Sequence, residues 1–344
     1  MLSIQIVLFD GFDLLDAIAP YEVFHAASMN LKDNLSVEFV TAEGARSVKS
    51  GVNDVLLEAK EKLDPTRPGI ILVPGAAGAV DGDGPDSIPA ILGRAMNTEL
   101  TGMVEHALNQ KDIVIAAVCG GSLLLAMGGL LEGRYTVTHH LGMDALAATG
   151  ATPVPARVVD DGNFVSGGGV TSGLDVALYL VERELGPRIA HAVEQLFEFE
   201  RRGTVWRDVG LVPRNDTAKA ENDESGTANK GDHTDSAIHH QSRQASVFDG
   251  DWATEITTPV GKLDVALSIS TDKEMIRGKA IQGEETVEFV NPAIQDNKLT
   301  WSLPITKPMR LNLKFEVSVD GNKMVGTAKA GVLPASKLTG KRIL

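Results

Sequence analysis

The chain has 344 residues, of which 43% are hydrophobic and 23% are charged. This length exceeds the usual size of a single hydrophobic core and favours two domains. The net charge of -14 would repel phosphate backbones, so we expect no nucleic-acid partner. No run approaches the roughly 20 apolar residues that cross a bilayer, so we expect no membrane partner either.

The first residues of the chain are predicted to form a buried strand. Its apolar run has no basic region before it and acidic residues soon after it, which is not the layout of a secretory signal. The chain contains one cysteine and therefore cannot form an internal disulfide. Together these features predict a cytoplasmic protein with a free thiol.

Residues 1–205 are predicted to form an α/β domain. Four nearly continuous apolar runs are typical of strands buried on both faces of a parallel sheet, namely 4–9, 37–42, 69–75 and 112–118. Helical patterns lie between strands, and residues 174–185 repeat apolar positions at steps of three and four. This alternation predicts a flavodoxin-like, doubly wound parallel sheet with helices on both faces.

A polar stretch separates this domain from the rest of the chain. Residues 206–246 are predicted to be a flexible linker, because from residue 214 onward the composition is too polar to offset the entropy of ordering. Residues 247–344 then alternate in short segments between Gly, Asp and Asn turns, with a strong hairpin signal at 319–322. We expect a second, smaller antiparallel β domain of roughly seven or eight strands, either a barrel or a sandwich.

No activity is assigned to the second domain. It contains neither His nor Cys. Trp252 and the segments 257–261 and 340–342 resemble a β-barrel-like appendage fused to unrelated bacterial enzymes, and that resemblance implies no chemistry.

Cys119 is the most informative residue. The strand over 112–118 runs into it, and Gly120, Gly121 and an apolar helix follow. A sharp strand-to-helix turn that pushes a nucleophile outward needs small neighbours. The helix N-terminus favours the thiolate, which predicts a lowered thiol pKa. The alternative is a buried structural cysteine, and the turn favours the reactive one.

The segment 116–134 resembles the nucleophile elbow of the ThiJ/PfpI superfamily, which has the class I glutamine-amidotransferase-like fold. Four further motifs stand in the order and spacing of that superfamily, namely 14–24, 72–78, 136–140 and 161–178. Within it, the Asp-x-x-x-Pro pattern at 16–20 and residues 162–175 most resemble isonitrile hydratases and the sensor halves of some transcription regulators.

The resemblance implies a carboxyl group beside the cysteine. Asp16 holds that place, and a carboxylic acid there can share a proton with the sulfur and deliver it to a substrate. The alternative is that Asp16 caps a helix that begins near Ala17. Glu22 is the weaker carboxylate candidate in the substrate pocket, or an interface residue.

The resemblance also implies a backbone oxyanion site. Its donors would be the N–H groups of Gly120 and Ala76, with Gly75 beside them. Isonitrile hydratases carry threonine where this chain has Gly120, and glycine is usual where it has Ala76. The missing threonine hydroxyl puts that particular activity in question.

His139, Gly168 and Gly169 complete the expected pocket. His139 matches the Thr-His pair of the superfamily and would orient Cys119 or supply positive charge; alternatively it is a hydrogen-bonded core residue at a strand end. Gly168 and Gly169 would line the pocket with close-packed backbone, since no nucleotide-binding fingerprint accompanies them. His139 and His140 would face opposite sides of a strand, so no metal site is expected.

These residues predict a cysteine-dependent hydratase or hydrolase that acts on a small electrophilic substrate. The best specific interpretation is hydration of an isonitrile to an N-substituted formamide, with no metal or organic cofactor. The alternatives are a glyoxalase or amidase-type enzyme of the same superfamily, or a ligand-binding or redox-sensing module without turnover. A homodimer is expected because members of the superfamily commonly form one.

Overall fold

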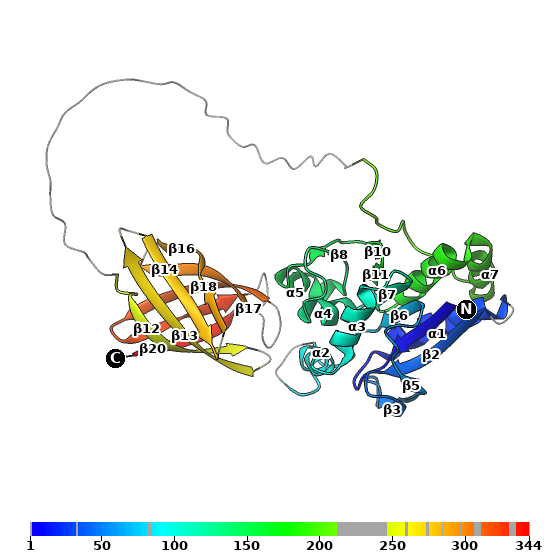
Figure 1. Ribbon diagram of the computed structural model, residues 1–344, viewed down its shortest axis with the longest axis horizontal. Helices are drawn as coiled ribbons and strands as arrows, with labels where there is room; N and C mark the ends of the chain where they lie inside the picture. Colours follow the sequence, from blue (N-terminus) through cyan, green and yellow to red (C-terminus); the bar gives the residue numbers. More distant parts are fainter. Residues whose placement is uncertain are drawn as a thin grey trace, which may run out of the picture.

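The protein contains two main β-sheets, each with a hydrophobic core (Figure 1). The computed structural model describes residues 2–31, 34–80, 84–211, 246–258, 261–272, 275–283, 285–295, 297–305, 311–329 and 335–343. Most of the predicted linker, residues 212–245, lies outside the described residues. The predicted domain boundaries therefore stay predictions.

The first sheet has seven strands in the order β10-β11-β7-β6-β1-β2-β5 within the described residues. Its strands are β1 (Leu2–Val7), β2 (Leu35–Thr41), β5 (Glu61–Lys62), β6 (Gly69–Val73), β7 (Ile113–Val118), β10 (Val158–Asp160) and β11 (Phe164–Gly167). All neighbours pair in parallel except β10 and β11. The four predicted apolar runs become β1, β2, β6 and β7, and the flavodoxin-like α/β fold is confirmed.

Helices cover this sheet in two groups. The first group packs together and comprises α1 (Leu14–Met29), α6 (Ser172–Leu185) and α7 (Pro187–Phe197). The second group comprises α2 (Ile88–Met96), α3 (Leu100–Leu108) and α4 (Gly121–Met127). In this group α2 contacts both α3 and α4. The remaining short elements are β3 (Arg46–Lys49), β4 (Leu56–Ala59), β8 (Tyr135–Thr136), η1 (His140–Gly142), α5 (Met143–Ala148) and β9 (Thr152–Pro153).

The second sheet is antiparallel and nearly closed. Its strands are β12 (Gly250–Thr258), β13 (Gly261–Asp272), β14 (Met275–Gln282), β15 (Glu285–Glu288), β16 (Val290–Gln295), β17 (Lys298–Ile305), β18 (Leu311–Asp320), β19 (Lys323–Lys329) and β20 (Ser336–Ile343). They follow the order β15-β14-β13-β12-β20-β19-β18-β17-β16, and β14 also contacts β16. The result is a barrel-like sheet. It has nine strands within the described residues, whereas roughly seven or eight were predicted. The predicted hairpin at 319–322 is confirmed, because Asp320 pairs with Lys323 across it.

Aromatic side chains fill the interior of this barrel. Trp252 is fully buried and donates from Nε1 to the carbonyl of Phe248 at 2.9 Å. The ring of Trp301 stacks between Phe289 and Phe315, with centroid distances of 4.4 and 4.8 Å. Such packing stabilises the sheet by burying large apolar areas.

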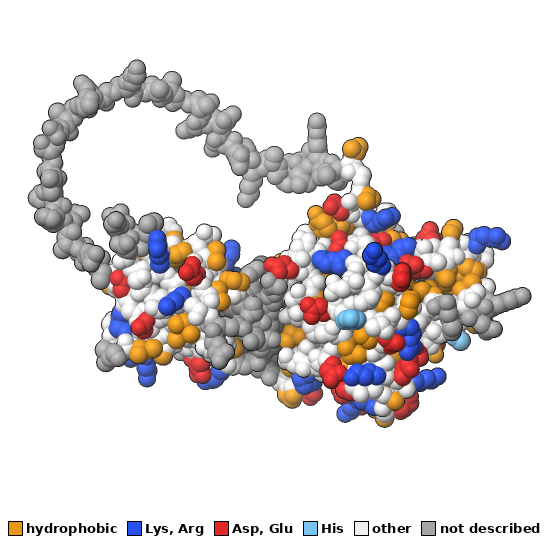
Figure 2. Space-filling view, viewed as in Figure 1, with side chains coloured by type: hydrophobic (Ala, Val, Ile, Leu, Met, Phe, Trp, Pro, Cys, Tyr) orange, Lys and Arg blue, Asp and Glu red, His pale blue; other side chains and the backbone are white. Residues whose placement is uncertain are grey.

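No helix in the described part of the chain is long and apolar enough to cross a membrane. On the face shown in Figure 2, acidic and basic side chains are interspersed over both sheets.

Candidate active site

Cys119 lies at a strained turn between β7 and α4. Its φ of 55° is in the left-handed region, which non-glycine residues seldom adopt. Its N–H donates to the carbonyl of Gly167 at 3.0 Å, so the end of β11 holds the turn. Gly121 then packs so closely on the carbonyl of Val73 that a Cβ there would overlap it. This is the geometry of a nucleophile elbow.

Thr138 fixes the other side of the elbow. Its Oγ1 donates to the carbonyl oxygen of Cys119 at 2.6 Å, and both residues are buried. The chain before it is tied to β11, because Ser166 Oγ accepts from the N–H of Val137 at 3.0 Å. Sequence reasoning missed this role of Thr138. The available signal was its place in the same short motif as His139.

Asp16 lies in the first turn of α1 and its side chain is completely buried. Its Oδ2 accepts from the N–H of Gly75 at 3.0 Å, while Oδ1 has no hydrogen-bond partner within the described residues. The cap of α1 is Asp13, whose Oδ1 accepts from the N–H groups of Leu15 at 3.0 Å and Asp16 at 3.4 Å. The alternative in which Asp16 itself caps the helix is therefore wrong.

Burial makes Asp16 a weak acid. Desolvation, followed by the charge of Asp13, raises the pKa of Asp16 to about 8, although the Gly75 N–H and the nearby Cys119 oppose the shift. At neutral pH the side chain is therefore mainly a carboxylic acid rather than a carboxylate. A buried acid that keeps its proton at pH 7 can act as a proton donor.

The Cys119 thiol is also shifted. Burial, followed by the charge of Asp16, raises the pKa of the thiol, and a hydrogen bond from the Gly120 N–H opposes this. The predicted lowering of this pKa is wrong. The sulfur is in a residue only 7% exposed, beside a second acid, and α4 spans only seven residues. Desolvation and a like charge outweigh the partial charge of a helix end.

Cys119 and Asp16 thus form a coupled pair. The charge of Asp16 raises the pKa of the Cys119 thiol, whereas the hydrogen bond with Cys119 lowers the pKa of Asp16, so the titration of each group depends on the other. At neutral pH the pair holds both protons.

The predicted oxyanion donors lie close together. The Gly120 N–H bonds the sulfur, and a Cβ built on Gly120 would lie 3.6 Å from the N atom of Ala76. Gly75 is required by close approach, because a Cβ there would lie 2.5 Å from Gly120 N and 2.8 Å from Asp16 Oδ2. The part that Gly120 and Ala76 play in catalysis stays a prediction.

His139 is half-buried and lies beside Gly169. It caps the N-terminus of η1, where its Nδ1 accepts from the Leu141 N–H at 3.3 Å, rather than ending a strand. Burial and then His140 lower the pKa of His139, with Asp13 opposing them, so it is mainly neutral at pH 7. The predicted positive charge beside Cys119 is thus not supplied at that pH.

The remaining predicted pocket residues divide into two groups. Gly168 is buried and donates to the carbonyl of Arg157 at 3.1 Å, and a Cβ on Gly169 would lie 3.8 Å from His139 Cδ2. Gly168 and Gly169 therefore come directly after the end of β11, where the Gly167 carbonyl accepts from the N–H of Cys119. Glu22 is exposed on α1, about 9 Å further along the helix axis than Asp16, and is not brought to the site.

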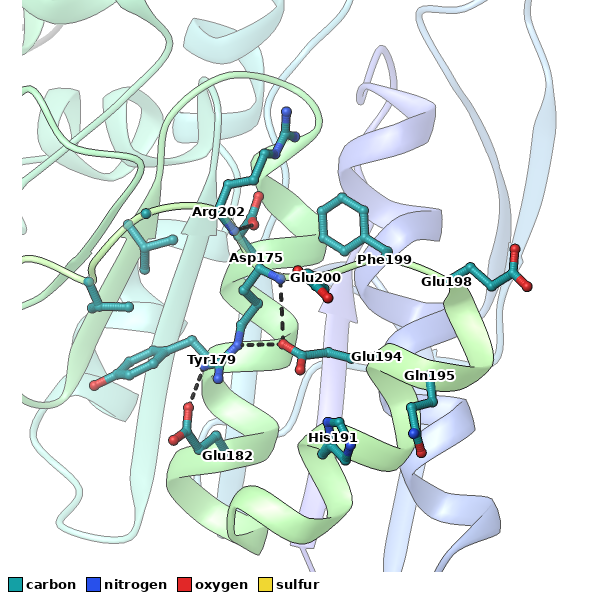
Figure 3. A pocket seen from close by; sticks show the side chains of 14 residues that line it. Asp175, Tyr179, Glu182, His191, Glu194, Gln195, Glu198, Phe199, Glu200 and Arg202 are labelled. Atoms are coloured by element: carbon teal, nitrogen blue, oxygen red, sulfur yellow. Dashed lines mark hydrogen bonds and ion pairs between the residues drawn. The ribbon is translucent and has the colours of Figure 1, made fainter.

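A hollow lies elsewhere in the same domain. It encloses about 880 Å³ between α6, α7 and the segment 199–205 (Figure 3). Its central charges are already paired, since Arg201 binds Glu194 at 2.9 Å and also Glu182. Within the described residues, no group of three or more His, Cys, Asp or Glu side chains is placed to hold a metal ion. The strained cysteine, and an acid whose Oδ1 has no hydrogen-bond partner within the described residues, make the elbow the better candidate site.

A parallel α/β sheet, a positive-φ cysteine at a strand-to-helix turn and a buried acid beside it define the class of cysteine-elbow α/β proteins. The model of the DJ-1/PfpI family matches residues 2–183, and the chain belongs to this family.

Relatives agree over parts of the chain. An isonitrile hydratase of Pseudomonas putida is 36% identical over 130 residues, which cover 38% of this chain and 51% of that protein. The HTH-type transcriptional regulator GbdR of Pseudomonas aeruginosa is 34% identical over 90 residues, covering 25% of this chain and 24% of the regulator. The match thus spans about half the length of the hydratase and a quarter of the regulator.

The chain is also similar to solved structures. A ThiJ/PfpI family protein from Pseudomonas syringae is 26% identical with a TM-score of 0.49, over 58% of this chain and 76% of that one. DJ-1beta of Drosophila melanogaster is 19% identical with a TM-score of 0.47, over 58% of this chain and 98% of that one.

Proposed function

We propose that the protein is a cysteine-dependent hydratase or hydrolase of a small substrate with an electrophilic carbon. Hydration of an isonitrile to an N-substituted formamide is the specific reaction. One observation carries the proposal: a buried Asp16 that keeps its proton at neutral pH lies beside Cys119 at a strained elbow. Membership of the DJ-1/PfpI family and the partial match to an isonitrile hydratase support it.

The first step joins the substrate to the sulfur. Asp16 gives its proton to the terminal carbon of the isonitrile, the Cys119 sulfur bonds to that carbon, and the thiol proton passes to Asp16. The product is a thioimidate, R–N=CH–S–Cys119, with Asp16 again protonated. The net change is addition of the S–H group across the carbon, and no oxidant or reductant is consumed.

This step suits a thiol whose pKa is raised. A resting thiolate is not needed, because the thiol proton leaves as the carbon–sulfur bond forms and Asp16 receives it. The Gly120 N–H stabilises negative charge that develops on the sulfur during the transfer.

The second step releases the product. Water adds to the thioimidate carbon, the nitrogen gains a proton, and the carbon–sulfur bond breaks to give R–NH–CHO and the free thiol. The N–H groups of Gly120 and Ala76 would stabilise charge in the tetrahedral intermediate. Isonitrile plus water equals formamide, so the cycle balances.

The redox-sensing alternative makes a different demand on Cys119. Oxidation to sulfenate and sulfinate proceeds from the thiolate, and burial disfavours that form here. Glyoxalase and amide-hydrolysis reactions would use the same two residues, Cys119 and Asp16. They are distinguished from isonitrile hydration by which substrate the protein turns over. The predicted homodimer stays a prediction.

The test is turnover of an alkyl isonitrile, with the formamide detected by mass spectrometry. Cys119→Ala should lower the rate on the order of a thousandfold or more. Ser122→Ala is the matched control, because it removes from α4 a buried hydroxyl that has no hydrogen-bond partner within the described residues, and it should leave turnover unchanged.

Unchanged turnover in Cys119→Ala would overturn the proposal. Consumption of methylglyoxal without loss of the isonitrile would replace hydration by glyoxalase chemistry. Selective oxidation of Cys119 by mild peroxide, with no turnover of either compound, would replace catalysis by sensing.

A further inference from the structure

Asp13 touches both backbone segments that hold Asp16. Its N–H donates to the carbonyl of Gly75 at 2.8 Å, and its Oδ1 accepts from the N–H groups of Leu15 and Asp16. Gly75 in turn donates to Asp16 Oδ2. The Asp13 carboxylate is therefore held at the start of α1, and the backbone of Gly75 links Asp13 to Asp16.

The charge of Asp13 acts on groups from three elements. Asp16 lies on α1, Cys119 lies at the elbow, and His139 lies at the start of η1. The ring of His140 lies 4.3 Å from that of His139. Within the described residues no Lys or Arg forms an ion pair with Asp13, so no fixed cation offsets its charge there.

The structural role of Asp13 does not require its charge. Asn and Ser cap helices about as well as Asp, because the cap needs only a side-chain oxygen that accepts from the first turn. A carboxylate beside two buried acids adds a second effect, since it disfavours the appearance of further negative charge nearby.

We infer that Asp13 is a positioning residue that keeps the Cys119–Asp16 pair protonated through its fixed negative charge, separately from its role as the cap of α1. This inference deepens the proposed function by naming what maintains the proton donor. Its test needs no substrate, so it can fail or succeed independently of the hydratase proposal.

The test uses the fact that the chain has one cysteine. Alkylation by iodoacetamide, followed by intact mass across pH 6 to 10, therefore reports on Cys119 alone. In a coupled pair the alkylation rate rises with pH until Asp16 ionises and then levels off, because the new carboxylate disfavours the thiolate. The wild-type profile should break near pH 8.

Asp13→Asn should move this break to lower pH by about half a unit to one unit, because it removes the charge and keeps the cap. Asp13→Ser is the second variant and should shift the break in the same direction. His139 titrates below its ordinary pKa and so lies below the break.

Asp10→Asn is the matched control. It removes one negative charge from the same loop, where Asp10 pairs with Arg46 at the surface, and it should leave the break in place. Thermal unfolding identifies any variant that has lost its fold. A break that stays within about 0.2 units in folded Asp13→Asn and Asp13→Ser would overturn the inference. So would a wild-type profile without a break.

Discussion

The two sheets of this protein use burial in opposite ways. In the α/β sheet, buried polar side chains gather around Cys119, and they include Asp16, Thr138 and Ser166. In the described part of the barrel, the buried side chains are aromatic and aliphatic apart from Thr254, which donates to a carbonyl at 2.6 Å. The α/β region buries a carboxylic acid, which costs stability, whereas the interior of the barrel is filled by packed apolar side chains, which contribute stability.

This difference teaches where chemistry can lie. Burying a carboxyl group is unfavourable unless it is neutralised or hydrogen-bonded, and Asp16 meets that cost by keeping its proton and accepting from Gly75. The aromatic stack Phe289–Trp301–Phe315 contains no carboxyl group and offers no proton at neutral pH, and its one buried polar atom, Trp301 Nε1, has no hydrogen-bond partner within the described residues. The comparison predicts that substitutions near Asp16 and Cys119 change how the protein responds to pH. Substitutions in the barrel core should change only its stability.

The largest expected effect is the pH dependence that Asp16 gives to folding. Its pKa is raised from 3.8 to about 8, so its contribution to stability is fully present below about pH 4 and is lost as pH rises towards 8. The wild type should lose about 6 kcal/mol over this window relative to Asp16→Asn, whose side chain does not titrate. Urea unfolding followed by the helical circular dichroism signal measures this. Parallel curves for the two proteins would contradict it.

The next effect should be confined to the barrel. Trp252→Ala removes a fully buried ring and its hydrogen bond to Phe248, and it should destabilise the barrel by about 3 to 5 kcal/mol. Unfolding followed by tryptophan fluorescence measures this loss. The alkylation profile of Cys119 should keep its break near pH 8, and a shifted break would show that the two regions are not separate in their chemistry.

A smaller effect is expected at the elbow. Thr138→Val removes the hydroxyl that bonds the Cys119 carbonyl and should cost about 1 to 2 kcal/mol, with roughly tenfold slower turnover as the strained turn relaxes. Thr149→Val is the control, because it removes a similar buried bond, to the Leu146 carbonyl at 2.7 Å, away from the elbow. Equal turnover losses in the two variants would remove the positioning role of Thr138.

The smallest effect is expected at Gly120. Its backbone lies in the right-handed helical region, and a Cβ would meet Gly75 Cα and Leu92 Cδ1 at 3.5 Å, which is ordinary contact. Gly120→Thr should therefore change stability by less than about 1 kcal/mol. Gly75→Ala, whose Cβ would overlap Gly120 N, should be clearly destabilising. Thermal unfolding compares the two, and equal shifts would show that the close approach at Gly75 is not needed.

Much of the α/β fold follows from sequence because its signals are local. Strands such as β6 and β7 are short β-branched runs buried on both faces, and the small residues after Cys119 predict the turn that the positive φ confirms. In the barrel, the number of strands depends on register. A shift between Val290 and Ala293 and the short strand β15 are not evident from alternation alone.

The site was harder to predict because it depends on burial and on contacts between distant segments. The thiol pKa of Cys119 depends on its exposure and on Asp16, which α1 brings from far along the chain. Asp13 and Asp16 both fit a cap by residue type, and only the actual start of α1 distinguishes them. Glu22 lies on the same helix but is exposed, because six residues carry it around the axis and away from the elbow.

The protonation state of Asp16 is the central claim, and an infrared difference titration measures it most directly. Subtracting the spectrum of Asp16→Asn from that of the wild type isolates one carboxyl group. The account predicts a carboxylic-acid C=O band at pH 7 that disappears with a midpoint near pH 8. A carboxylate band already complete at pH 6 would contradict it.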